Sequence, residues 1–277
     1  MDVFVRNKAY TGPVQAVILD WAGTAVDYGC VGPVAVFIEV FRRRGVSVTI
    51  PEARGPMGLM KKDHVRQMCA TPSVAAKWRA VWNRQPNEAD VEAMYADVEP
   101  LLISSVARFA DPIPGVIEAV ATLRRQGIRI GSSTGYTGPM MEVLTRAAAE
   151  KGYAPDAVVS ASDVPAGRPY PWMCYLNALK LQVYPFEAMA KIGDTVADIQ
   201  EGLNARMWTI GVTRTGNELG LSIEEQSSLD PIELATRLST ITETFRNAGA
   251  HFVAESMADC PALIAEINTR LARGERP

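Results

Sequence analysis

Several polar side chains along this sequence could each serve one need of a reaction at phosphorus. The carboxylate of Asp20 can attack phosphorus and form an aspartyl-phosphate. Asp194 and Asp198 suit Mg²⁺, a hard ion that prefers oxygen ligands and bridges to phosphate. The hydroxyl of Thr134 can hold non-bridging oxygens, and the guanidinium of Arg168 can offset their charge. Together these residue types predict phosphoryl transfer.

The elements that must position these side chains alternate between strands and helices. Short apolar runs at 14–19, 127–131, 157–160, 189–193 and 208–212 predict buried strands, and helical patterns at 116–126, 139–151, 172–180 and 196–205 separate them. This alternation predicts an α/β fold with a doubly wound, three-layer parallel sheet. Ligands bind beyond the carboxyl ends of such strands, and Asp20, Thr134 and Asp194 follow strand ends.

A long stretch without strand signals separates the first two predicted strands. Helical patterns occupy 32–44, 72–83 and 89–106, and a capping box with proline at Thr49–Glu52 predicts a further helix start. The stretch is too long for an ordinary loop. We therefore expect an inserted helical cap domain at 28–108 and a core domain at 1–27 and 109–277. The tail after Glu218 is expected to be helical and mostly polar.

Taken in order, four motifs resemble those of the haloacid dehalogenase superfamily. They are DWAGT at 20–24, Thr134, Arg168 and GDTVAD at 193–198. No single motif is specific, but the ordered set at strand ends is, and the match covers the whole chain. The resemblance implies that Asp20 is the nucleophile and a Mg²⁺ ligand. It also implies that Ala22 contributes its carbonyl, Asp194 a second carboxylate, and Asp198 support.

The sequence departs from most phosphatases of that superfamily at Ala22, where they have a second aspartate. That aspartate protonates the departing alkoxide, which is a poor leaving group without it. A phosphonate loses a carbon group instead. Converting a neighbouring aldehyde into a protonated imine provides an electron sink, and this requires an amine from the enzyme.

The cap contains a candidate amine in the segment RGPMGLMKKDH at 54–64, which is expected to begin a helix. Met57, Lys61, His64 and Met68 would then share one helix face. Methionines would desolvate Lys61, and the cation Arg168 would act in the same direction, so both would lower its pKa. His64 could move protons during imine formation.

This segment, the DWAGT loop and GRPYPW at 167–172 resemble the phosphonoacetaldehyde hydrolase family. The resemblance implies magnesium-dependent hydrolysis of phosphonoacetaldehyde to acetaldehyde and phosphate, in the degradation of 2-aminoethylphosphonate, through a Lys61 Schiff base. It also implies a homodimer formed through the cap. The residues implied to bind substrate or surround the lysine are Thr134, Gly135, Tyr136, Arg168, Cys30, Met57 and His64. Whether Lys61 or its neighbour Lys62 faces the core rests on helix phase and on this resemblance.

Three alternatives stay open. The first is a phosphomonoesterase or sugar-phosphate mutase, which Ala22 would deprive of its acid. The second is a metal-independent haloacid dehalogenase, which the pair Asp194 and Asp198 disfavours. The third is a catalytically silent phosphate-binding protein, which the joint retention of four residues disfavours: Asp20, Thr134, Arg168 and Asp194.

Composition narrows the classes of partner. The 277 residues carry a net charge of −3, which disfavours nucleic acid or an anionic membrane as partner. Four cysteines without CxxC spacing, Cys30, Cys69, Cys174 and Cys260, fit a reducing cytosol. Residues 1–10 lack a signal-peptide pattern, and no apolar run approaches the roughly 20 residues of a membrane span. We expect a cytoplasmic protein.

Overall fold

A parallel sheet forms the centre of the computed structural model, which describes residues 9–277. Within that range the sheet has six strands, in the order β3-β2-β1-β4-β5-β6. The strands are β1 (Ala16–Leu19), β2 (Arg129–Thr134), β3 (Ala157–Ser160), β4 (Met189–Gly193), β5 (Trp208–Val212) and β6 (Phe252–Ala254). The strand order reverses between β1 and β4, and in such sheets ligands bind at that point beyond the carboxyl ends.

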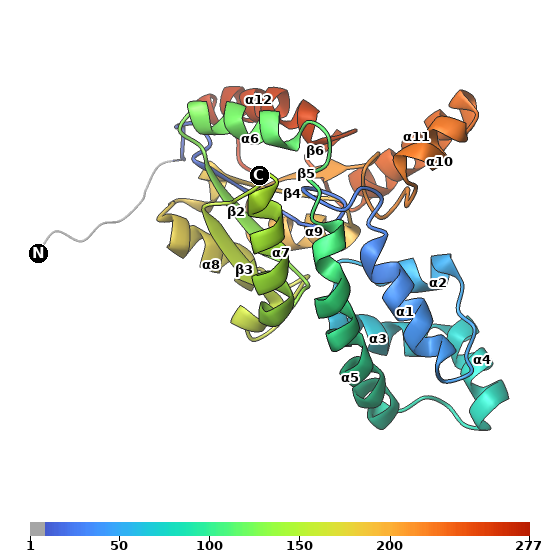
Figure 1. Ribbon diagram of the computed structural model, residues 1–277. Coiled ribbons are helices and arrows are strands. Elements are labelled where there is room, and N and C mark those ends of the chain that lie inside the picture. The colour runs from blue at the N-terminus through green and yellow to red at the C-terminus, as the bar shows by residue number, and fades with distance from the viewer. Residues whose placement is uncertain (1–8) are drawn as a thin grey trace, which may run out of the picture.

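Helices cover both faces of the sheet (Figure 1). Alternate residues of β1 point to opposite faces, so Val17 and Leu19 join the core under α6 (Val116–Arg125) and α12 (Cys260–Ala272). Ile18 packs on the other face against α8 (Trp172–Leu181), beside α9 (Val196–Asn204). Further helices are α7 (Gly138–Glu150), α10 (Ile223–Ser228) and α11 (Pro231–Asn247), and short 3₁₀ turns are Val106–Phe109, Ala161–Asp163, Phe186–Ala188 and Met257–Asp259. The predicted doubly wound, three-layer α/β fold is confirmed.

Of the six α-helices between β1 and β2, the first five gather at one end of the molecule (Figure 1). They are α1 (Gly32–Arg42), α2 (Ile50–Arg54), α3 (Lys61–Ala70), α4 (Pro72–Trp82) and α5 (Glu88–Ser105), and are called the helical insertion below. Phe37, Phe41 and Trp78 are buried among them. The division into a core and a cap domain at residues 28 and 108 stays a prediction.

The expectation that one helix runs through Met57 to Met68 is wrong, because the helix begins later than Met57. Helix α2 ends at Arg54, and α3 begins only at Lys61. A glycine with a φ of +90° at Gly58 and a proline at Pro56 lie between them, and both residues interrupt helices. Met57 therefore does not share a helix face with Lys61. The capping box predicted at Thr49 is confirmed.

The tail after Glu218 was expected to be helical, but it also contains a strand, β6, between α11 and α12. This strand has three residues, and Phe252 and Val253 are half-buried at the edge of the sheet. So short a run carries little alternation for a pattern to reveal.

Within residues 9–277, every helix is too short or too polar to cross a lipid bilayer. The expectation about residues 1–10 falls mainly on residues 1–8, which lie outside the described range.

Candidate active site

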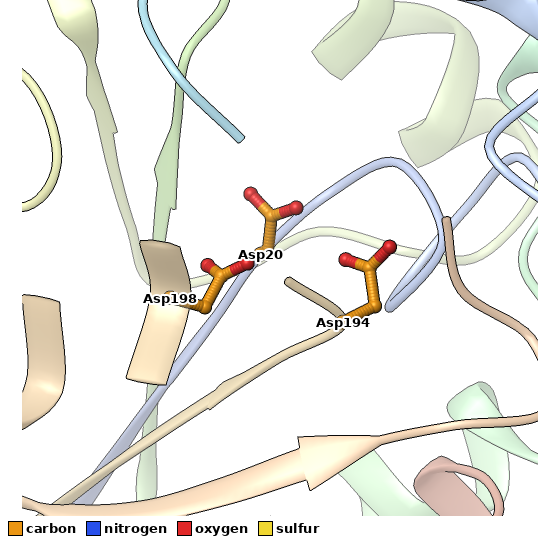
Figure 2. A group of neighbouring side chains, drawn as sticks. All are labelled: Asp20, Asp194 and Asp198. Carbon is orange, nitrogen blue, oxygen red and sulfur yellow. The ribbon is translucent and has the colours of Figure 1, made fainter. Parts of the chain in front are cut away.

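Three carboxylates meet where the strand order reverses (Figure 2). Asp20 follows β1, Asp194 follows the neighbouring strand β4, and Asp198 lies in the first turn of α9. Oxygen atoms of the three side chains lie within 4.8 Å of one another, and all three residues are buried. The pairing of β1 with β4 thus brings together residues that are more than 170 positions apart in the sequence.

Cations compensate one side of this carboxylate cluster. Arg168 Nη2 lies 2.7 Å from Asp20 Oδ1 and 3.0 Å from Asp198 Oδ1. Lys191 Nζ lies 2.6 Å from the same oxygen of Asp198. Burial alone would raise the pKa of Asp198, but the charges of Arg168 and Lys191 outweigh it and lower that pKa. Asp198 therefore stays ionised in the interior.

On the other side of the cluster, Asp194 contacts no cation within residues 9–277. Burial raises the pKa of Asp194 well above its usual value, and the charges of Asp20 and Asp198 raise it further. Neutral donors hold its oxygens, because Thr24 Oγ1 lies 3.0 Å from Oδ1 and the Asn217 N–H donates to Oδ2 over 2.8 Å. A divalent cation between Asp194 and Asp20 would remove this penalty, so the donor set fits a hard ion such as Mg²⁺. Asp198 is already engaged by cations, which suits a supporting position.

A narrow cavity of about 20 Å³ lies beside the carboxylates, between the sheet and the helical insertion. Nine of the residues singled out in the sequence line it: Asp20, Ala22, Cys30, Met57, Lys61, Thr134, Gly135, Tyr136 and Arg168. Gly58 and Thr195 complete the lining, and Asp194, Asp198 and His64 do not belong to it. This volume has room for about one water molecule, so the side chains of the two regions nearly close the cavity.

Lys61 projects into this cavity from the first residue of α3. Only 5% of the residue is exposed, and its Nζ lies 4.5 Å from the centre of the Tyr136 ring. Burial lowers the pKa of Lys61, and the charge of Arg168 acts in the same direction against the raising effects of Cys30, Asp20 and Asp27. The positive end of the α3 dipole also disfavours an ammonium there. By contrast, Lys62 is partly exposed and pairs with Glu92.

His64 lies one turn behind Lys61 rather than in the cavity lining. Its ring stacks on Phe37 with 3.8 Å between ring centres, and Nε2 lies 2.9 Å from the carbonyl oxygen of Ala53. Burial lowers the pKa of His64 well below its usual value, with help from the charge of Lys61. The ring is therefore neutral, and its role in proton movement stays a prediction.

Cys30 lines the cavity from a residue with a φ of +49°. Burial raises the pKa of its thiol well above the usual value, and the charges of Asp27 and Asp194 add to that effect. Cys30 is therefore a neutral thiol beside Lys61. Tyr136 and Met57 are also buried in the lining.

Sequence reasoning missed three buried charged residues around the site. Glu201 accepts from Arg168 Nε over 2.9 Å and from Ser133 Oγ over 3.1 Å, so it fixes the direction of the guanidinium. Lys191 lies in the middle of β4, and Asp27 follows the nucleophile loop. Two signals were available: a lysine inside an apolar strand, and a glutamate three residues after Asp198, on the same helix face.

Comparisons with known proteins point to one enzyme family. The family model described as haloacid dehalogenase-like hydrolase matches residues 14–206. A protein of Syntrophobacter fumaroxidans named phosphonoacetaldehyde hydrolase-like protein is 62% identical over 277 residues, which is 100% of both chains. A phosphonoacetaldehyde hydrolase of Nitratidesulfovibrio vulgaris is 57% identical over 100% of this chain and 99% of its own. One of Bacillus cereus is 50% identical over 92% of this chain and 96% of its own.

Solved structures extend the likeness. The crystal structure of a phosphonoacetaldehyde hydrolase-like protein from Oleispira antarctica superposes with a TM-score of 0.95 at 41% identity, covering 100% of both chains. A β-phosphoglucomutase from Clostridium difficile shares the fold with a TM-score of 0.66 at 16% identity, covering 93% of this chain and 98% of its own.

Proposed function

The chain belongs to the haloacid dehalogenase-like hydrolases and, within them, to the phosphonoacetaldehyde hydrolase family; from that premise we propose that it hydrolyses phosphonoacetaldehyde to acetaldehyde and phosphate. One observation carries the proposal. Among the described residues that line the cavity, Asp20 is the only carboxylate and Lys61 is the only primary amine. The cavity thus offers a nucleophile for phosphorus and an amine for an aldehyde, but no carboxylic acid to protonate an ester oxygen.

Lys61 acts first, on the aldehyde carbon. Its lowered pKa increases the fraction of neutral amine near neutral pH, and only the neutral amine adds to a carbonyl. Condensation releases water and leaves a protonated imine. Arg168 and Thr134 would hold the phosphonate oxygens on the sheet side of the cavity, with the aldehyde toward Lys61.

Asp20 then attacks phosphorus. The new bond joins a carboxylate oxygen to phosphorus, the phosphorus–carbon bond breaks, and its electron pair moves into the imine to leave an enamine. The hydrogen bond from Arg168 to Oδ1 orients the carboxylate. Protonation of the enamine, followed by attack of water on the imine and on the aspartyl-phosphate, releases acetaldehyde and phosphate and restores both side chains.

Asp20, Asp194 and the Ala22 carbonyl would hold Mg²⁺, with Asp198 in support. When bound, the ion supplies positive charge that offsets the repulsion between the carboxylate nucleophile and an anionic phosphonate. The position of buried Asp194 beside two other carboxylates, with only neutral donors on its own oxygens, supports this assignment.

The competing functions fit the cavity less well. A phosphomonoesterase needs an acid for its leaving group, and the side chain at that position is the methyl group of Ala22. A metal-independent dehalogenase has no use for a second buried carboxylate without a cation. A silent binding protein would not need a desolvated amine at Lys61.

The proposal also covers the cellular location and the oligomeric state of the protein. The substrate would arise during 2-aminoethylphosphonate breakdown in the cytoplasm, and the four free, buried cysteines are consistent with a reducing compartment. A homodimer would form through the cap domain. Exposed apolar side chains on the helical insertion, Ile50, Val81 and Trp82, support such a contact. Substituting Val81 by glutamate should then lower the molar mass measured by light scattering from dimer to monomer.

Borohydride trapping tests substrate, residue and mechanism together. Treating the protein with phosphonoacetaldehyde and borohydride should add the reduced fragment to the peptide that carries Lys61, as read by mass spectrometry. Lys61→Arg should abolish the adduct. Lys62→Arg is the matched control and should retain it, because Lys62 faces solvent and Glu92. A protein that releases acetaldehyde without forming any adduct would refute the imine mechanism.

A further inference from the structure

One arginine of the helical insertion binds the loop before α1 and the loop after β5 at once. Arg54 is the last residue of α2. Its Nη1 donates to the carbonyl oxygens of Gly29 (2.9 Å) and Cys30 (3.2 Å), and to Asn217 Oδ1 (3.1 Å). Its Nη2 donates to the carbonyl oxygen of Gly220 over 2.9 Å. A single guanidinium therefore connects the start of the helical insertion to the loop after β5.

That loop reaches the carboxylate cluster directly. The backbone N–H of Asn217 donates to Asp194 Oδ2 over 2.8 Å, while the Asn217 side chain bonds Arg54. The Asn217 amide also donates to the carbonyl oxygen of Arg54 over 3.4 Å. A continuous chain of hydrogen bonds thus runs from Arg54 through Asn217 to Asp194.

The loop is tightly fitted at both of its ends. At Gly220, where φ is +65°, an added Cβ would lie 2.7 Å from Arg54 Cζ. At Gly216, an added Cβ would lie 2.3 Å from Asp194 Cβ. Gly220 N–H also donates to the Gly216 carbonyl oxygen over 2.9 Å, which closes the loop on itself. A displacement of Arg54 would therefore move the groups that contact Asp194.

Asp194 depends on these groups more than its neighbours do. Asp20 and Asp198 are both held by the cation Arg168. Within residues 9–277 Asp194 makes no ion pair, and its two oxygens are oriented by the Thr24 hydroxyl and the Asn217 N–H. Loss of one of these two neutral donors leaves that oxygen without its hydrogen bond.

We propose that Arg54 is a positioning residue: by holding Asn217 it orients the carboxylate of Asp194, so the carboxylate cluster is complete only while the helical insertion is docked on the sheet region. The inference rests on the proposed function, in which Asp194 is a ligand of Mg²⁺. It assigns to the helical insertion a part in metal binding, although none of its own residues would touch the ion.

The test compares Arg54→Lys with a matched arginine of the helical insertion. Lysine keeps the charge but cannot span the four acceptors of the guanidinium. Arg44 is the control, because it bonds the carbonyl oxygens of Val40 and Ala93 and the carboxylate of Asp97, all within the helical insertion. Magnesium chloride is titrated into each full-length protein by calorimetry. We expect Arg54→Lys to weaken Mg²⁺ binding about tenfold, as losses in an outer shell do. Arg44→Lys should remain within about twofold of the unsubstituted protein.

A second variant separates positioning from folding. Asn217→Ala removes the side chain that Arg54 holds but keeps the backbone N–H. It should weaken Mg²⁺ binding about as much as Arg54→Lys, and the double variant should be no weaker than either, because both act through one path. Hydrogen exchange at the Asn217 amide should accelerate in both single variants.

The inference is overturned if Arg54→Lys and Asn217→Ala both bind Mg²⁺ within twofold of the unsubstituted protein, even where their unfolding midpoint falls. It is also overturned if their effects add in the double variant, or if the unsubstituted protein binds no Mg²⁺. Failure to release acetaldehyde from phosphonoacetaldehyde would refute the proposed function while leaving these binding measurements intact.

Discussion

Two buried lysines lie near the carboxylate cluster, and their surroundings give them opposite properties. Lys191 lies inside β4, with Nζ 2.6 Å from Asp198 and 3.7 Å from Glu201. Those carboxylates outweigh the cost of burial and raise the pKa of Lys191. Lys61 lies in the cavity lining, makes no ion pair within residues 9–277, and has a pKa that burial lowers. The same side chain is a fixed cation in the sheet and a potential nucleophile in the helical insertion.

The difference shows that burial alone does not determine what a lysine does. Both residues lie almost entirely out of solvent. The partner decides, because a contacting carboxylate stabilises the ammonium, whereas an aromatic ring at 4.5 Å and a facing guanidinium do not replace lost hydration. Substitutions that remove one lysine at a time test whether the two lysines differ in this way.

The largest effect is expected from Lys61→Met. Turnover of phosphonoacetaldehyde should fall by about four orders of magnitude, because the amine that forms the imine is gone. The free energy of unfolding should stay within about 1 kcal/mol of the unsubstituted protein or increase, since a desolvated amine is replaced by an apolar side chain of similar length. Steady-state kinetics and urea unfolding measure the two. A variant that remained active, or one that lost several kcal/mol, would remove the contrast with Lys191.

Lys191→Met should mainly affect stability. It leaves the buried carboxylate of Asp198 with one cation instead of two, and breaking a buried ion pair on one side costs about 3–5 kcal/mol. Urea unfolding should report a loss of that size, in contrast to Lys61→Met. If the two variants proved equally stable, the charge environments of the two lysines would not differ as the geometry indicates.

A smaller effect is expected from Asp27, whose charge acts on Lys61 through space. Burial raises the pKa of Asp27 from 3.8 to about 6, opposed by the N–H groups of Gly32 and Val31. A carboxyl whose pKa is raised on folding stabilises the fold fully below its unfolded pKa, and that contribution is lost as pH rises through the folded value. The unsubstituted protein should therefore lose about 2 kcal/mol relative to Asp27→Asn between pH 4 and pH 6.

The same variant should also sharpen the difference between the lysines. Without the Asp27 charge, which raises the pKa of Lys61, more neutral amine is present at pH 7. The rate of borohydride trapping should then rise by about twofold to threefold and reach its plateau at a lower pH. Urea unfolding at each pH and trapping rates against pH provide the two measurements. If the free energies of unfolding of the two proteins changed in parallel between pH 4 and pH 6, the raised pKa of Asp27 would be contradicted.

The physical reasons for success and failure in sequence-based prediction differ between these regions. Strands β3, β4 and β5 were predicted at their observed bounds because each is a compact apolar run bounded by turn residues. Met57 was expected near Lys61 and does line the same cavity, but through the turn around Gly58 and not through a helix face. Local patterns predict local structure, and a turn that folds back lies beyond them.

The buried charged residues that contact Arg168 and Asp198 were harder to predict from the sequence than the strands. Lys191 and Glu201 have clear meaning only when β4, α9 and Arg168 are known to lie together. Likewise, the bond between Arg54 and Asn217 joins residues 163 positions apart, and the segment that begins at Arg54 does not reveal this partner. Motifs identify the groups that react, whereas the groups that hold them in place are revealed by tertiary contacts.

The divided lining of the cavity has a consequence for how such enzymes diversify. Asp20, Thr134 and Arg168 come from the sheet region, whereas Met57, Gly58 and Lys61 come from the helical insertion. The two halves are encoded by separate stretches of the gene, so each is exposed to its own mutations. A lineage that altered the insertion would inherit intact chemistry at phosphorus while acquiring a different partner for the rest of the substrate. Novelty in bond specificity can thus arise without rebuilding the half of the catalyst that reacts with phosphorus.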